Sequence, residues 1–262
     1  MVTDDTASDI RLDVSENSVL LIAHPAHELL IHHWMEQARP TVLILTDGAG
    51  SSGIARIDSS RVNVLGAGAR PGPLFGVHSD AAIYRKILDR DLAFFKGVLD
   101  GVTQTLVDEN AGLFVSDPVE HYSPVHDLCA AIAAIAATRA AQILDHPIRY
   151  MQFPIEYRDQ TQGVPLVLHL PQDAIARKLG AAGRVPGVAE ERARLLAMDP
   201  LLLASEILWE MAPGHEALPA PTTEPFYEHY GRLRITQGLF SELITYRHQL
   251  RPLVAALAAS ET

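Results

Sequence analysis

Two histidines lie three residues apart in the segment His24-Pro25-Ala26-His27-Glu28, directly after a short apolar run. A turn followed by the start of a helix can direct both imidazoles toward one point. Imidazole is a common ligand of zinc and of other divalent metals, and such a site needs further protein ligands. The pair therefore predicts half of a metal site at the end of the apolar run.

A second histidine-rich segment, residues 120–127, offers the missing ligand because it contains His121 and His126. This segment follows a predicted strand and opens a predicted helix, so His126 can reach the same edge as the first pair. Three imidazoles around an open coordination position form a site that lowers the pKa of a bound water to roughly 7. The predicted ligands are His24, His27 and His126, and the predicted metal is zinc or another divalent cation.

The elements that must position these side chains have the pattern of a parallel sheet. Apolar runs over residues 19–23 and 42–45 flank a helical segment over 28–37, and a third apolar run covers 113–115. A strand, a helix and a strand in this order form a right-handed crossover, so the carboxyl ends of both strands lie at one edge. Ligands of α/β sheets bind at that edge. His24, after the first strand, and Asp47, after the second, are therefore predicted to share it.

The remaining pattern completes an α/β domain. A long surface loop is predicted over residues 48–79, with a short element near 61–65. Helices are predicted over 80–99, 124–143, 172–179, 188–197, 201–211 and 235–258, and strands over 148–155 and 164–170. The fold class predicted is a three-layer, Rossmann-like α/β domain with a mostly parallel sheet. It would comprise residues 1–262 as one domain, with a loose arm over 1–17 and a helical C-terminal extension over 186–262.

Composition restricts the partners and the location. The chain has 21 Lys and Arg against 32 Asp and Glu, and the net charge of −11 repels nucleic acids and anionic membranes. The first apolar run of five residues is far shorter than the roughly 20 that span a bilayer, and acidic residues precede it. The single cysteine, Cys129, suits a reducing compartment. We expect a cytoplasmic protein; its C-terminal helix can pack on the domain or on a second subunit, which leaves a homo-oligomer open.

The first histidine segment, Ala23 to Glu28, and the second strand's ending, Thr46-Asp47-Gly48, resemble the LmbE/PIG-L family of zinc-dependent N-deacetylases. Members of that family remove acyl groups from amino sugars, and their first motif reads His-Pro-Asp-Asp-Glu. The resemblance extends over most of the chain. Near the C-terminus it includes Phe226, Tyr227, Tyr230, Gly231, Ile244, Tyr246 and His248.

The resemblance implies a retained metal scaffold and an altered hydrolytic apparatus. His24 falls on the family's first metal ligand, His27 on its aspartate ligand and His126 on its third ligand. Ala26, however, falls on the aspartate that serves the family as general base, and a methyl group cannot accept a proton. Ser123 falls where the family often has a second catalytic histidine.

Amide hydrolysis requires a base for the attacking water and a proton donor for the leaving amine. Glu28 is the candidate substitute base, although the equivalent glutamate of the family usually has a supporting role. His121 is the preferred acid or oxyanion donor. Asp47 either acts as a base or orients a histidine. Asp117 and Glu120 lie at the same predicted edge and are further alternatives.

Three functions are compatible with these residues. The first is a metal-dependent hydrolase that acts on the amide of an N-acylated amino sugar or a small polar metabolite. The second is a metal-retaining binding protein that has lost hydrolysis together with the aspartate. The third is a different chemistry at a three-histidine metal, such as iron. Metal content and turnover of N-acylated amino sugars distinguish the three.

Overall fold

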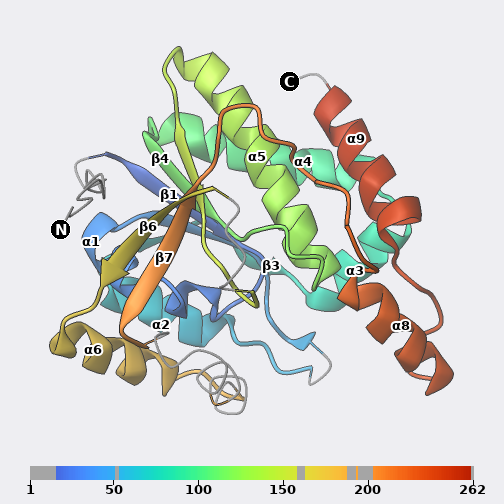
Figure 1. Ribbon diagram of the computed structural model, residues 1–262, viewed down its shortest axis with the longest axis horizontal. Helices are drawn as coiled ribbons and strands as arrows, with labels where there is room; N and C mark the ends of the chain where they lie inside the picture. The colour runs from blue at the N-terminus through green and yellow to red at the C-terminus, as the bar shows by residue number, and fades with distance from the viewer. Residues whose placement is uncertain (1–15, 51–52, 158–162, 188–192, 194–202, 261–262) are drawn as a thin grey trace, which may run out of the picture.

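The computed structural model describes residues 16–50, 53–157, 163–187, 193 and 203–260 (Figure 1). A single sheet of seven strands lies at its centre, in the order β3-β2-β1-β4-β5-β7-β6. Helices cover both faces of this sheet. The predicted three-layer α/β fold with a mostly parallel sheet is confirmed.

The order of the strands creates a crevice at the centre of the sheet. β1 to β5 pair in parallel, whereas β7 runs antiparallel to both of its neighbours. The chain places β2 and β3 on one side of β1 and then returns to add β4 on the other side. Ligands of such sheets bind where this reversal occurs, outside the carboxyl ends of the strands. The strands are β1 (Ser18–Ile22), β2 (Thr41–Thr46), β3 (Arg70–His78), β4 (Leu113–Ser116), β5 (Arg149–Gln152), β6 (Val164–His169) and β7 (Ser205–Glu210).

The central strands are buried on both faces, which is why their sequences are continuous apolar runs. Successive side chains of a strand point to opposite faces. Leu21 packs into the core beneath α4 and α5, whereas Leu20 and Ile22 pack into the core beneath α1 and α2. The helical elements are η1 (His27–Leu29), α1 (His32–Ala38), α2 (Ile57–Gly66), α3 (Asp80–Leu88), α4 (Leu92–Asp108), α5 (Pro124–Leu144), α6 (Gln172–Ala182), α8 (Phe226–Thr236), η4 (Tyr246–Leu250) and α9 (Arg251–Ala259).

The helix α5 is the one described helix whose length and apolar composition would let it cross a membrane. However, 72% of its apolar stretch is buried inside the protein, where α5 packs against α4, α9 and the sheet. Its composition is therefore that of a core helix. Because α5 begins at the carboxyl end of the sheet, its first turn faces the central crevice.

The prediction of a long surface loop over residues 48–79 is wrong for most of that range, because the range contains α2 and β3. β3 is an edge strand with mostly exposed or half-exposed residues and two shifts in register, so it lacks a continuous apolar run. The single helix expected over 80–99 is also wrong. Arg90, with a φ of +50°, separates α3 from α4, and the side chain of Asp91 caps α4 by accepting a hydrogen bond from the amide of Phe94.

Two predictions for the C-terminal region are wrong. The helix expected over 201–211 is the strand β7, whose Leu208 and Trp209 are buried and which pairs with β5 and β6. The helix expected over 235–258 is interrupted, because α8 ends at Thr236 and Gly238 follows with a φ of +70°. Residues 186–262 thus add a strand to the sheet as well as helices. Most of the helix expected over 188–197 and most of the expected arm fall outside the described residues.

Candidate functional site

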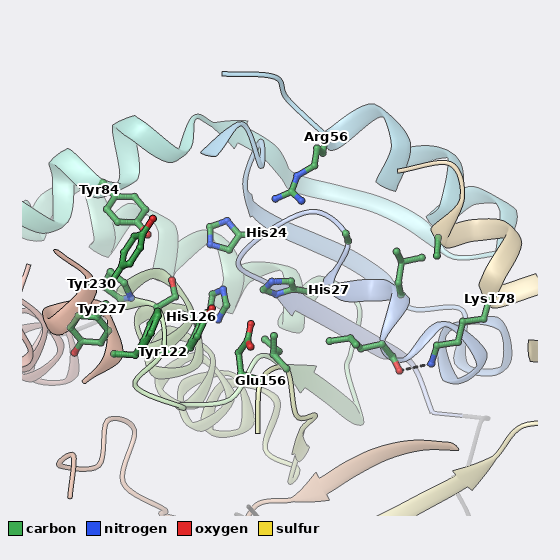
Figure 2. Close-up of a pocket in the computed structure, with 18 of the residues that line it drawn as sticks. His24, His27, Arg56, Tyr84, Tyr122, His126, Glu156, Lys178, Tyr227 and Tyr230 are labelled. Carbon is green, nitrogen blue, oxygen red and sulfur yellow. Dashed lines mark hydrogen bonds between the residues drawn. The ribbon is translucent and has the colours of Figure 1, made fainter. Parts of the chain in front are cut away.

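Three imidazoles converge at the crevice between β1 and β4 (Figure 2). His24 follows β1, His27 opens η1, and His126 lies in the first turn of α5. The ring centroids are 5.5 Å apart for His24 and His27, 5.1 Å for His24 and His126, and 4.7 Å for His27 and His126. All three rings line one cavity of about 480 Å³. The structure thus brings together the three histidines that were predicted as metal ligands.

Two of these rings are held from behind by buried carboxylates. Nδ1 of His24 lies 3.0 Å from Oδ1 of Asp80, and Nδ1 of His27 lies 3.0 Å from Oδ2 of Asp117. Burial alone would raise the pKa of Asp80, but its hydrogen bond to His24 and the charge of that ring hold the pKa well below its usual range. A carboxylate at Nδ1 favours the tautomer whose Nε2 carries the lone pair. Metal-ligating histidines are commonly oriented in this way.

His126 is the most buried of the three rings. Burial, followed by the proximity of His27 and His24, lowers its pKa well below the usual value, so the ring is neutral. Its Nδ1 has no hydrogen-bond partner among the described residues. A buried polar atom without a partner costs about 1–3 kcal/mol, and a divalent cation would relieve that cost. The donor set, three imidazoles, therefore fits zinc or a similar metal.

The ring nitrogens of His24, His27 and His126 lie close together, but they are not arranged around one point. Within the described part of the chain, no group of three His, Cys, Asp or Glu side chains is arranged to hold an ion. The roles of His24, His27 and His126 as ligands therefore stay predictions.

An aromatic wall forms one side of the cavity. Tyr122 and Phe226 stack with a centroid distance of 4.6 Å and an interplanar angle of 2°, and Phe226 stacks in turn on Tyr230. Tyr84 on α3 and Tyr227 on α8 complete this wall, which Figure 2 shows beside His24 and His126. The C-terminal residues singled out in the sequence thus include three that line the cavity.

The opposite side of the cavity is mainly apolar. Leu29 and Leu30 contribute from the segment after the first histidine motif, and Leu179 and Ala182 contribute from α6. Lys178 also lines this side, but its Nζ donates to the carbonyl of Leu30 and lies 2.9 Å from the buried carboxylate of Glu206. Arg56 lines the cavity near His24 and donates from Nε to the carbonyl of Gly48.

The three residues predicted to act in catalysis do not line this cavity. Glu28 is fully buried, and its Oε2 accepts a hydrogen bond of 2.7 Å from the amide of Ala26. Asp47 accepts hydrogen bonds from the amides of Ala49 and Asp80, so it ties the loop after β2 to the start of α3. Both carboxylates support the backbone around the histidines.

His121 is held outside the cavity by Asp127. The buried carboxylate of Asp127 accepts from the amide of His121 at 3.0 Å and lies 3.1 Å from its Nδ1. The backbone of His121 has a φ of +54°, and its ring contacts Tyr246. The sequence shows only that His121 lies two residues before Ser123. It does not reveal the turn at His121, which places this side chain away from the other imidazoles.

Of the two further alternatives, Asp117 orients His27, and Glu120 holds the backbone after β5. The carboxylate of Glu120 accepts hydrogen bonds from the amides of Ile155, Glu156 and Tyr157. Burial raises the pKa of Glu120 to about 7, against the effect of these amides.

Sequence reasoning missed two acidic side chains at this site. Asp80 was predicted only as the first residue of a helix, whereas its carboxylate faces His24 and Ser79 caps α3. Glu156, which lines the cavity, comes shortly after β5. Its place after a predicted strand was the signal that could have identified it, since strand ends meet at this edge. Asp80 gave no such signal because β3 was not predicted.

Comparison with known proteins shows similarity in fold. No protein-family model matches the chain, and a search of curated proteins gave no match. The A40926 pseudoaglycone deacetylase Dbv21 superposes with a TM-score of 0.51 at 15% identity, over 79% of this chain and 99% of that one. A zinc-inhibited form of the teicoplanin deacetylase Orf2 gives 0.47 at 12% identity, over 76% and 100%. At such identities the likeness to Dbv21 establishes a shared fold.

Proposed function

We propose that this protein is a metal-dependent hydrolase that removes the acyl group from an N-acylated amino sugar or a similar small polar molecule. The convergence of His24, His27 and His126 at the central crevice carries this proposal. Zinc or another divalent cation, bound there, would supply Lewis acidity to activate water and to polarise the amide carbonyl. Dbv21, which shares the fold, is named as a deacetylase, and the first histidine motif resembles that of the LmbE/PIG-L deacetylases.

The residues around the three imidazoles suit the two halves of such a substrate. The stacked rings of Tyr122 and Phe226 offer a flat apolar surface for the ring of a sugar. Leu30 and Leu179, on the opposite side, offer an apolar surface for the acyl group. The scissile amide would then lie between them, beside the histidines.

Metal analysis is the first test. After chelation and dialysis, the protein should bind one Zn²⁺ or Co²⁺ per chain in a calorimetric titration. His27→Ala and His126→Ala should each weaken binding at least tenfold. His248→Ala, at an exposed position of η4, is the matched control and should bind metal as the wild type does. Unchanged binding in both site variants would contradict the proposal.

A specific observation supports a second candidate function, a binding protein without turnover. Ala26 cannot accept a proton, and neither Glu28 nor His121 lines the cavity. Turnover of N-acetylglucosamine and related N-acyl amino sugars by the metal-loaded protein separates the two candidates. Release of free amine, absent in His126→Ala, supports the hydrolase, whereas stoichiometric metal without turnover supports the binding protein.

A further inference from the structure

Glu156 is the one acidic side chain among the described residues that line the cavity. Only 7% of the residue is exposed. Figure 2 shows its carboxylate turned toward His27 and His126, from the side opposite Arg56. A carboxylate in this place faces the region where a reacting amide would lie.

The backbone that carries Glu156 is fixed by a second carboxylate. Glu120 accepts a hydrogen bond of 3.0 Å from the amide of Ile155 and one of 3.0 Å from the amide of Glu156. The amide of Tyr157 donates to Glu120 as well, at 3.2 Å. Three consecutive amides bound to one buried carboxylate leave the segment little freedom. Glu120 is therefore a positioning residue for Glu156.

The other candidate acids, Glu28, Asp80 and Asp117, do not line the cavity. Glu28 accepts from the amide of Ala26, Asp80 faces His24, and Asp117 faces His27. The side chain of Ala26 itself cannot accept a proton. A proton acceptor beside the three imidazoles must therefore come from another element, and the segment after β5 places Glu156 there.

We infer that Glu156 is a catalytic residue and acts as the proton acceptor of the hydrolysis. This inference rests on the proposed function. One carboxylate oxygen of Glu156 takes a proton from the attacking water while the water oxygen bonds to the amide carbon. Glu156 then returns this proton to the leaving nitrogen as the carbon–nitrogen bond breaks, and the products are a carboxylic acid and a free amine. General acid–base catalysis of this kind contributes about 10²- to 10⁴-fold to the rate.

Glu156→Gln tests this role because the amide keeps the shape but cannot accept the proton. We expect kcat for an N-acyl amino sugar to fall about 10²- to 10⁴-fold with little change in KM. Glu224→Gln, at an exposed glutamate, is the matched control and should retain wild-type kcat. A value of kcat for Glu156→Gln within threefold of the wild type would overturn the inference.

Two readouts do not depend on turnover. The affinity for Co²⁺ and the visible spectrum of the Co²⁺ protein should be the same in Glu156→Gln as in the wild type; loss of Co²⁺ would make Glu156 a ligand and overturn its role as proton acceptor. Acetohydroxamate, which chelates a metal and gives up a proton on binding, should bind at least tenfold more weakly to the Co²⁺-loaded variant. Equal binding would overturn the inference.

Replacing the missing acid completes the test. Ala26→Asp in the Glu156→Gln background should recover at least tenfold of the lost kcat, since Ala26 also lines the cavity and the change adds a carboxylate there. If kcat does not recover in the metal-loaded double variant, a carboxylate at position 26 does not share the proton-acceptor role of Glu156. Turnover by the wild type with unchanged kcat in Glu156→Gln would overturn the inference but not the proposed function, whereas a metal-loaded wild type without turnover would overturn both. A wild type that binds no metal would overturn both.

Discussion

Ala26 has an unusual backbone for an alanine, with φ of +85° and ψ of −11°. Residues with a Cβ adopt this left-handed conformation at a cost of roughly 1–2 kcal/mol, whereas glycine, aspartate and asparagine adopt it more readily. Hydrogen bonds from the amide of Ala26 to Glu28 and Ser60 hold this conformation. The turn between the two histidines therefore keeps a geometry suited to aspartate, although the side chain is a methyl group.

Ala26→Gly should stabilise the protein, because glycine relieves the left-handed strain at this position. We expect the free energy of unfolding to rise by about 0.5–1 kcal/mol in urea denaturation of the metal-free protein. Ala255→Gly, at an exposed position within α9, is the control and should lower it by about 1 kcal/mol. A loss of stability in Ala26→Gly would contradict the assigned backbone strain.

At the scale of elements, β7 supports α1, the helix that follows the segment with His24 and His27. The fully buried carboxylate of Glu206 on β7 accepts hydrogen bonds from the amides of His33 and Trp34, which begin α1. It also pairs with Nζ of Lys178 on α6. A carboxylate at a helix N-terminus satisfies amides that have no partner within the helix. β7, α6 and α1 are thus joined behind the apolar side of the cavity.

Glu206→Ala should be strongly destabilising because it leaves the ammonium of Lys178 buried without its carboxylate. Loss of one partner of a buried ion pair typically costs about 3–5 kcal/mol. Arg177→Ala removes the exposed pair with Glu36 and should cost less than about 1 kcal/mol. Thermal and urea unfolding of both variants measure this difference; similar small losses would show that the buried pair does not stabilise this region.

The whole molecule builds the cavity from distant parts of the chain. The histidines come from β1, η1 and α5, the aromatic wall mainly from the C-terminal α8, and the apolar side from η1 and α6. Figure 1 shows α6 and α8 on opposite sides of the sheet. A substrate that fills the cavity would therefore contact both sides at once. The expected cytoplasmic location, the lack of nucleic-acid and membrane partners and a homo-oligomer stay predictions from composition.

The apolar side of the cavity predicts a preference for acyl groups longer than acetyl. In a series of N-acetyl, N-butanoyl and N-hexanoyl glucosamine, kcat/KM should rise by up to about fourfold for each CH₂ that is buried. Leu179→Ser should flatten this rise, whereas Leu65→Ser, an exposed control on α2, should preserve it. A decrease in kcat/KM from the N-acetyl to the N-hexanoyl substrate would show that the acyl group does not bind on the apolar side of the cavity.

The sequence determined which strands form the centre of the sheet and which histidines follow them. β1, β2 and β4 are continuous apolar runs, because strands buried on both faces admit little else. Their carboxyl ends meet at one edge, so His24, His27 and His126 were correctly expected near one another. The strands β3 and β7 escaped prediction, because β3 is a partly exposed edge strand and β7 lies between β5 and β6 without a continuous apolar run.

Only the tertiary structure decided which way the polar side chains point. Glu28, Asp47 and His121 lie at the predicted edge, yet each is bound to nearby amides or carboxylates and does not line the cavity. Asp80 and Glu156 take the positions next to the imidazoles instead. The physical reason is that a strand end fixes where a residue lies, whereas its hydrogen-bond partners, drawn from other elements, fix its direction.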